Sequence, residues 1–106
     1  MAEITALTES TDYILLSLHT PRHGYGIMQR TAELSGGRIR LAAGTLYGAL
    51  NAMVDKGWIA PMPGEADSRN KKEYRLTDKG RLVLQTELTR LRELVSNGEM
   101  VLKEEA

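Results

Sequence analysis

The chain has 106 residues, of which 42% are hydrophobic and 26% are charged, and this size predicts a single small domain with a modest core. It contains no cysteine, which excludes disulfide bonds and cysteine-based zinc sites. A formal net charge of zero argues against a nucleic-acid partner, but residues 22–77 carry nine basic side chains against five acidic ones. The middle of the chain is therefore basic, while both ends are slightly acidic.

No apolar run approaches the roughly 20 residues that a membrane-spanning helix requires. The first segment, MAEITALTESTD, also lacks the basic and apolar regions of a signal peptide. We therefore expect a cytoplasmic protein with no membrane partner.

The first two predicted elements are helices. In LTESTDYILLSLHT the apolar residues recur at helical spacing, Thr8 or Ser10 can cap the helix, and Pro21 ends it. GYGIMQRTAELSGG predicts a second helix, for which Gly36-Gly37 supplies a left-handed stop.

A short extended segment, RIRL at 38–41, is predicted to lead into a third helix within LAAGTLYGALNAMVDKGWI. One continuous buried stripe is expected along this helix, formed by Leu46, Ala49, Leu50, Met53 and Val54. Gly57 ends the helix.

A hairpin and a long helix complete the chain. WIAPM at 58–62 and KEYRL at 72–76 predict two strands joined by a polar, turn-rich loop over 63–71. Thr77 is expected to cap the last helix, with Leu84, Leu88, Leu91 and Val95 forming an apolar seam. We expect this helix to break or fray at Asn97-Gly98, after about five turns.

The order helix, helix, short strand, helix, hairpin, long helix is typical of the winged helix-turn-helix plan, an α+β and mostly α class. In that plan the third helix enters the DNA major groove and the hairpin loop reaches the adjacent backbone. We expect a winged helix-turn-helix DNA-binding domain over 1–76, with a C-terminal dimerisation helix and tail over 77–106, in a single structural unit.

Four motifs also carry a family resemblance. HGYGIMQ, GTLYGAL, KGWI and EYRLTDKG, in this order and at this spacing, resemble the PadR family of bacterial transcriptional regulators, over roughly residues 8–95. The resemblance implies a DNA-binding winged-helix dimer, usually a repressor, that often loses DNA affinity on binding a small molecule. The chain looks like a short member, without the large C-terminal helical domain of some relatives.

The outward face of the third helix is the first candidate DNA contact, and it comprises Thr45, Tyr47, Gly48, Asn51, Ala52, Asp55 and Lys56. An ordinary solvated face explains Asp55 and Lys56 well. It explains Gly48 badly, because glycine in a helix interior costs about 0.8 to 1 kcal/mol relative to alanine.

A close approach of DNA to the helix would explain Gly48, because a glycine leaves room for the DNA. We predict that Thr45 meets a phosphate, that Tyr47 donates its hydroxyl to a phosphate or base edge, and that Asn51 pairs with adenine. The resemblance also implies that the tyrosine of this motif, here Tyr47, lies near DNA.

The hairpin loop supplies a second candidate contact, because Arg69, Lys71 and Lys72 fall within its SRNKK run. A solvated loop is the alternative, but the position after a recognition-type helix favours phosphate clamping. Glu65 and Asp67 weaken the positive field, so we expect modest and strongly salt-dependent affinity.

Three further residues have two interpretations each. Arg38 and Arg40 either touch the phosphate backbone or keep an edge strand soluble. Tyr25 either touches a phosphate at the start of the second helix or packs, and we favour packing.

The last helix is predicted to form a homodimer. Its leucine seam can pack against the first helix of the same chain, but Val83, Leu94 and Val101 add apolar surface on a second side. The expected interface comprises Leu84, Leu88, Leu91, Leu94 and Val95. A dimer would present two recognition helices to a roughly palindromic operator in double-stranded DNA.

The resemblance implies a small-molecule effector near the dimer interface, where the first and last helices meet. In this chain that region is lined by Leu15, Leu18, Leu88 and Leu91. A dense leucine seam is more often core than pocket.

An enzyme is not expected. His19 and His23 have the i, i+4 spacing of metal ligands on one helix, but Pro21 between them breaks that geometry. No phosphate loop or Ser/His/acid arrangement is present in a recognisable context, and no cofactor is implied. The alternative to DNA binding is a protein-interaction winged helix, an adaptor or antirepressor, in which Tyr47 and Trp58 anchor a partner. A net charge of zero needs no explanation in such a module.

Overall fold

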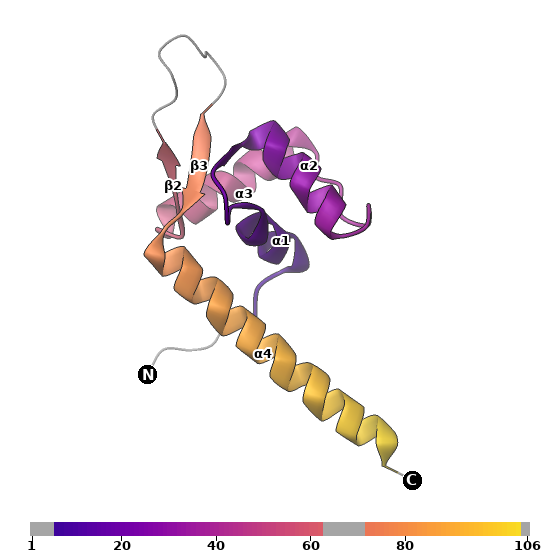
Figure 1. The fold of residues 1–106 in the computed structure, drawn as a ribbon. Helices are drawn as coiled ribbons and strands as arrows, with labels where there is room; N and C mark the ends of the chain where they lie inside the picture. Colours follow the sequence, from indigo (N-terminus) through magenta and orange to yellow (C-terminus); the bar gives the residue numbers. More distant parts are fainter. Residues whose placement is uncertain (1–5, 63–71, 105–106) are drawn as a thin grey trace.

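The computed structural model describes residues 6–62 and 72–104. The elements of these residues are α1 (Glu9–Ser17), β1 (Arg22–His23), α2 (Gly24–Leu34), α3 (Ala43–Asp55), β2 (Ile59–Met62), β3 (Glu73–Leu76) and α4 (Asp78–Lys103). The first three helices and the small antiparallel sheet form a globular part, from which α4 projects (Figure 1). The winged helix-turn-helix fold predicted from the sequence is confirmed, with α2 and α3 as the helical pair and β2 and β3 as the wing strands.

Local sequence signals set the first two helices. The Thr8 side chain accepts a hydrogen bond from the Thr11 N–H at 3.2 Å, so Thr8 is the cap of α1. His23 caps α2 in the same way, since its Nδ1 accepts from the Gly26 N–H at 3.2 Å. Gly36, at φ +64°, begins the left-handed stop predicted after α2.

The short strand lies elsewhere than predicted. Residues 38–41 form no strand, because the Arg38 and Ile39 N–H groups are bonded to Ser35 at the end of α2. Instead β1 pairs antiparallel with β3, so the sheet order is β1-β3-β2. The segment between α1 and α2 therefore closes the free edge of β3.

The wing strands have the predicted alternation. Ile59 lies opposite Leu76 and Pro61 lies opposite Tyr74 in the β2–β3 ladder. Ile59, Tyr74 and Leu76 are buried, whereas Pro61 is exposed on an edge strand, where a missing N–H is tolerated. The loop that joins the strands lies outside the described residues, and so do the predicted contacts Arg69 and Lys71.

The core lies between the three short helices, the sheet and the first turns of α4. It comprises Ile14, Leu15, Leu18, Ile27, Leu46, Leu50, Met53, Ile59, Tyr74, Leu76 and Leu84. The buried stripe predicted for the third helix is thus present at Leu46, Leu50 and Met53, with Ala49 and Val54 half-buried beside it.

The start of α4 is fixed to the globular part. Thr77 Oγ1 accepts from the Gly80 N–H at 3.0 Å and donates to the Trp58 carbonyl at 2.9 Å. Gly80 lies so close to Trp58 that a Cβ on this glycine would come within 2.8 Å of the Trp58 carbonyl carbon. The predicted cap is confirmed, and it fixes the direction in which α4 leaves the domain.

The break predicted at Asn97-Gly98 is wrong, because α4 continues through both residues to Lys103. One glycine costs a helix only about 1 kcal/mol, and the residues that follow, EMVLK, are mostly good helix formers. At 26 residues the helix is about 39 Å long. Within the described part of the chain, no helix is both long and apolar enough to cross a membrane.

Candidate nucleic-acid interface

The outward face of α3 is open. Thr45, Tyr47, Gly48 and Asn51 are all exposed, while the opposite side of the helix enters the core. A Cβ added at Gly44 or Gly48 would meet nothing within 4 Å, and neither glycine has a positive φ. Neither the backbone nor the packing of the described residues requires glycine at these two positions. The absence of side chains on this part of the α3 surface therefore has no intramolecular explanation.

Tyr47 is more constrained than a freely projecting side chain. It is 43% exposed, and its hydroxyl lies against Gly24 at the start of α2. The Tyr74 phenol is also close: burial raises the pKa of Tyr74, and the nearby Tyr47 phenol raises it further. The ring of Tyr47, which projects from α3, therefore lies against the start of α2 and is partly open to solvent.

Tyr25 does not pack into the core. It is 63% exposed in the first turn of α2, so the packing interpretation is wrong. It directly follows Gly24, the residue that Tyr47 touches. Exposed tyrosine rings from α2 and α3 thus lie near the same helix start.

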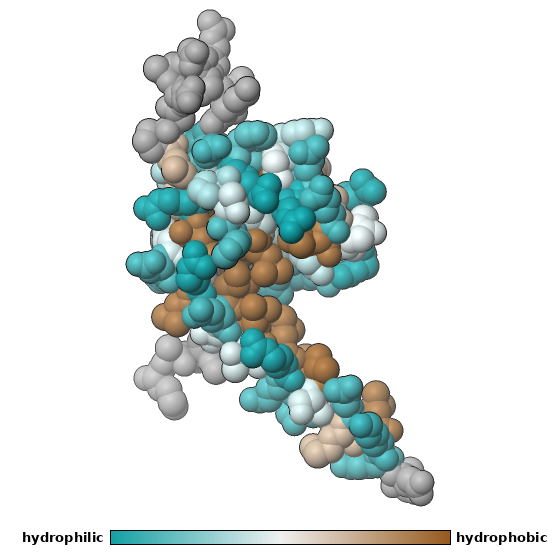
Figure 2. Space-filling view, viewed as in Figure 1, coloured by the Kyte–Doolittle hydropathy of each residue, from teal (hydrophilic) through white to brown (hydrophobic). Residues whose placement is uncertain are grey.

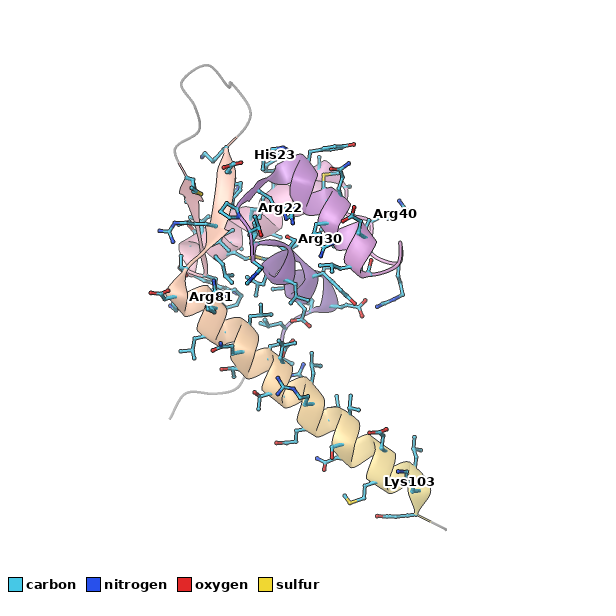
Figure 3. The ribbon with its side chains drawn as sticks, viewed as in Figure 1. Arg22, His23, Arg30, Arg40, Arg81 and Lys103 are labelled. Atoms are coloured by element: carbon cyan, nitrogen blue, oxygen red, sulfur yellow. The ribbon has the colours of Figure 1, made fainter. Side chains whose placement is uncertain are left out.

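The two arginines before α3 are not equivalent. Arg38 forms an ion pair with Glu9 of α1, which partly neutralises its charge. Arg40 is exposed and its guanidinium approaches Gly37, at the opposite end of α2 from His23 (Figure 3). Positive charge available in front of α3 therefore comes from Arg40 rather than from Arg38.

Two other basic residues lie near the sheet. Lys72 is exposed immediately before β3, where the hairpin loop ends. Arg22, which the sequence analysis did not select, donates from Nε to the Ser17 carbonyl at 2.7 Å and joins the end of α1 to β1. The role of Arg22 shown by this hydrogen bond is structural, and no sequence pattern around Arg22 predicts it.

The predicted dimer residues lie at very different depths. Leu84 is 9% exposed and belongs to the core, Leu88 and Leu91 are half-buried, and Leu94 and Val95 are each 59% exposed. Further along, α4 exposes Met100, Val101 and Leu102. Figure 2 shows apolar side chains gathered where α4 meets the globular part and again along the projecting helix. Met100 and Leu102 lie beyond Asn97-Gly98, where the helix was expected to break or fray, and of this segment only Val101 was predicted as apolar surface.

The predicted effector residues do not share one cavity. Leu15 and Leu18 are fully buried among core side chains. Leu88 and Leu91 instead line a shallow depression on α4 together with Val95 and three polar residues, Arg92, Ser96 and Glu99. Neither Leu15 nor Leu18 lines this depression, although Leu88 packs against the core that contains both.

A carboxyl pair joins α1 to α4. Glu87 is 2% exposed and accepts from Arg90 Nε at 2.8 Å and from the Leu7 N–H at 3.3 Å. Burial and, after it, the neighbouring Glu87 carboxyl together raise the pKa of Asp12 to about 7, while the hydrogen bond from Arg90 lowers the pKa of Glu87. The signal in the sequence is a carboxylate that interrupts the leucine seam of α4.

The histidines do not form a metal site. His19 lies in the turn after α1, whereas His23 caps α2. Among the described residues, no group of three or more His, Asp or Glu side chains is arranged to hold a metal ion.

A three-helix domain with a β-wing and an open third helix defines the winged helix-turn-helix class. The family model "Transcriptional regulator PadR-like family" matches residues 14–86. The chain therefore belongs to the PadR-like family and is a transcriptional regulator. This membership points to a non-enzymatic role.

Solved structures support the same assignment. A PadR family transcriptional regulator from Eggerthella lenta DSM 2243 is 25% identical, with a TM-score of 0.74 over 90% of this chain and 82% of its own. A PadR family regulator from hypervirulent Clostridium difficile R20291 is 24% identical, with a TM-score of 0.74 over 90% and 99%. A putative transcriptional regulator from Thermoplasma acidophilum is 24% identical, with a TM-score of 0.69 over 92% and 93%. No functionally curated protein matched the sequence.

Proposed function

We propose that this regulator is a homodimeric repressor that binds a specific, roughly palindromic operator through α3. The observation that carries the proposal is the pair of exposed glycines on that helix, Gly44 and Gly48, with nothing within 4 Å of an added Cβ. Each glycine weakens the isolated helix relative to alanine, and a groove wall in close approach supplies the missing reason.

The remaining side chains of the face suit the major groove. Thr45, near the start of α3, can donate to a phosphate, and Asn51 can pair with an adenine edge. Since the Tyr47 hydroxyl lies against Gly24, we expect the open side of its ring to reach the sugar-phosphate backbone or a thymine methyl group.

Positive charge for the backbone contacts is available on both sides of α3. Arg40 precedes this helix, and Lys72 ends the hairpin loop, whose sequence also contributes Arg69 and Lys71. Such contacts position the protein without reading bases, and they make binding depend strongly on salt.

The projecting half of α4 supports dimerisation. Helical geometry places Val95 and Leu102 on the same side as Leu84, so the stripe that begins in the core continues onto exposed surface. Leu94 and Val101 widen it. A second copy of α4 would bury this surface and place two α3 helices on neighbouring major grooves.

A small-molecule effector completes the proposal. The shallow depression formed by Leu88, Leu91 and Val95 would lie beneath the partner helix in such a dimer. A ligand there would change the angle between the two α4 helices and thereby the spacing of the recognition helices, which releases DNA.

The test is fluorescence anisotropy with duplexes from the promoter regions around the gene and with a scrambled duplex, each at two salt concentrations. We expect a preference of about 10³-fold or more for one duplex, within the range of specific binders. Equal and weak binding to every duplex that disappears at higher salt would contradict the proposal. It would instead favour a protein-interaction module, to which zero net charge and the exposed Tyr25 and Tyr47 are also suited.

A further inference from the structure

Gly24 is the residue whose neighbourhood explains the orientation of Tyr47. It is the first residue of α2 and it is buried. A Cβ built on Gly24 would lie 2.8 Å from Tyr47 Cζ and 3.3 Å from Cε1, and it would clash with the hydroxyl as well. Carbon atoms in van der Waals contact are about 3.5 to 4.0 Å apart, so no side chain at position 24 is compatible with this placement of the ring.

The backbone does not require glycine at this position. Gly36, Gly37 and Gly57 have positive φ values, and Gly24 does not. Gly26, two residues later in the same helix turn, would place a Cβ no closer than 3.6 Å to any atom. The three atoms nearest to a Cβ at Gly24 all belong to Tyr47, so the closest steric demand at this position comes from that ring.

We propose that Gly24 is a positioning residue for DNA recognition: its missing side chain forms the seat in which the ring of Tyr47 is held at the edge of the α3 face. This inference rests on the proposed function of α3. A ring held in one rotamer before binding loses less conformational freedom on DNA than a ring that moves freely in solvent.

The contact joins two helices that are distant in sequence. Gly24 begins α2, directly after the strand β1 that pairs with β3, and Tyr47 projects from α3. An alanine at position 24 would push the ring out of this seat by rotation of its flexible side chain, while the backbone of α2 can stay in place.

The experiment is a double-mutant cycle with Gly24→Ala, Tyr47→Ala and the double variant, measured by anisotropy on the preferred duplex. Gly26→Ala is the matched control, because it adds the same methyl group in the same turn without a close contact. We expect Gly24→Ala to lower affinity about tenfold, the size of one good interface contact, and to have no further effect in the Tyr47→Ala background. Gly26→Ala should stay within about twofold of the wild type.

A measurement without DNA separates this inference from the proposed function. In the free protein, NMR should show a nuclear Overhauser contact between the Gly24 Hα protons and the Tyr47 ring. Gly24→Ala should change the chemical shifts of the Tyr47 ring protons, because the ring leaves its place against α2. If Gly24→Ala also lowers the melting temperature, Tyr47→Ala should restore it, because the clash is then removed.

Several results would overturn the inference. An equal loss of affinity from Gly24→Ala in the wild-type and Tyr47→Ala backgrounds would show that Gly24 acts independently of the ring. Unchanged affinity with a displaced ring would show that the seat does not matter for recognition. If the wild type binds no duplex, the proposed function fails, and a missing Gly24–Tyr47 contact in the NMR spectrum would separately remove the seat.

Discussion

Two helices of this protein present surface that the rest of the described chain does not cover, and the two surfaces have opposite chemistry. The open face of α3 is small and polar, with two glycines, a threonine and an asparagine around one tyrosine. The projecting half of α4 is apolar, with Val95 and Leu102 continuing the stripe of Leu84. A helix face with few large side chains and several hydrogen-bonding groups suits the polar groove of DNA, whereas an apolar stripe suits a second apolar helix.

Exposure alone therefore does not show which kind of partner a surface binds. Tyr47 and Val95 are similarly exposed, at 43% and 59%, yet their surroundings predict different partners. Substitutions confined to one of the two surfaces therefore separate their roles.

The largest expected effect is on the α4 stripe. Val95→Glu combined with Leu102→Glu should weaken dimerisation by about two orders of magnitude or more, because each buried, unpaired carboxylate costs several kcal/mol. Both side chains are exposed in the single chain, so the fold should be retained. Sedimentation equilibrium measures the change, and Thr89→Glu on the polar side of α4 is the control. A variant as dimeric as the wild type would place the interface elsewhere.

The wing should have the next largest effect. Lys71→Ala with Lys72→Ala should weaken binding about tenfold for every duplex and lower the salt slope by about two, since each lysine releases roughly one counterion on binding a phosphate. Anisotropy over a salt series gives both quantities. Affinity and slope equal to those of the wild type would remove the wing from the interface and leave α3 as the contact.

A smaller change tests the low surface of α3. Gly48→Ala should raise the free energy of unfolding by about 0.5 to 1 kcal/mol, because alanine favours helix, and should at the same time weaken DNA binding several-fold. Gly98→Ala in α4 offers the same gain in helix propensity and also meets open space, so it serves as the control. Denaturant titration and anisotropy measure the two effects. Improved stability with unchanged DNA affinity in both variants would contradict close approach at Gly48.

The last prediction concerns a pH dependence of stability at the joint between α1 and α4. The pKa of Asp12 is raised to about 7 in the folded protein, so the folded state binds this proton more tightly than the unfolded chain does. Its contribution to stability is fully present below the unfolded pKa near 4 and is lost as the pH rises towards 7. Asp12→Asn should flatten this part of the stability profile in urea titrations.

Glu87 contributes with the opposite sign, because its pKa is lowered in the folded state by Arg90. Its stabilisation is lost on acidification below the ordinary glutamate range, so the two carboxyl groups act in different pH windows. A wild-type profile that is flat between pH 4 and 7 would show that the Asp12 proton is not held by folding.

Much of the fold could be predicted because the signals are local. The Thr8 and Thr77 caps, the Gly36 and Gly57 stops and the period of Leu46, Leu50 and Met53 each act within a few residues. The strand β1 could not be placed in this way, because its partner, β3, lies about fifty residues further along the chain. The end of α4 differs from the expectation because the helix formers after Gly98 outweigh the cost of that one glycine.

The candidate site divides similarly. The exposed face of α3 follows from helical periodicity once its buried side is known, so Thr45, Tyr47, Gly48 and Asn51 could be selected from the sequence. The pairing of Arg38 with Glu9 and the exposure of Tyr25 required the packing of α1 and α2.

The sequence alone was enough to predict the helices, the caps at Thr8 and Thr77, the wing strands and the two open faces of this regulator. These features depend on periodicity and on residue types close together in the chain. Only the tertiary structure decided what lies across from what: β1 against β3, Glu87 against Asp12, and Gly24 beneath Tyr47. Such contacts join residues tens of positions apart, and packing in three dimensions alone brings their atoms together.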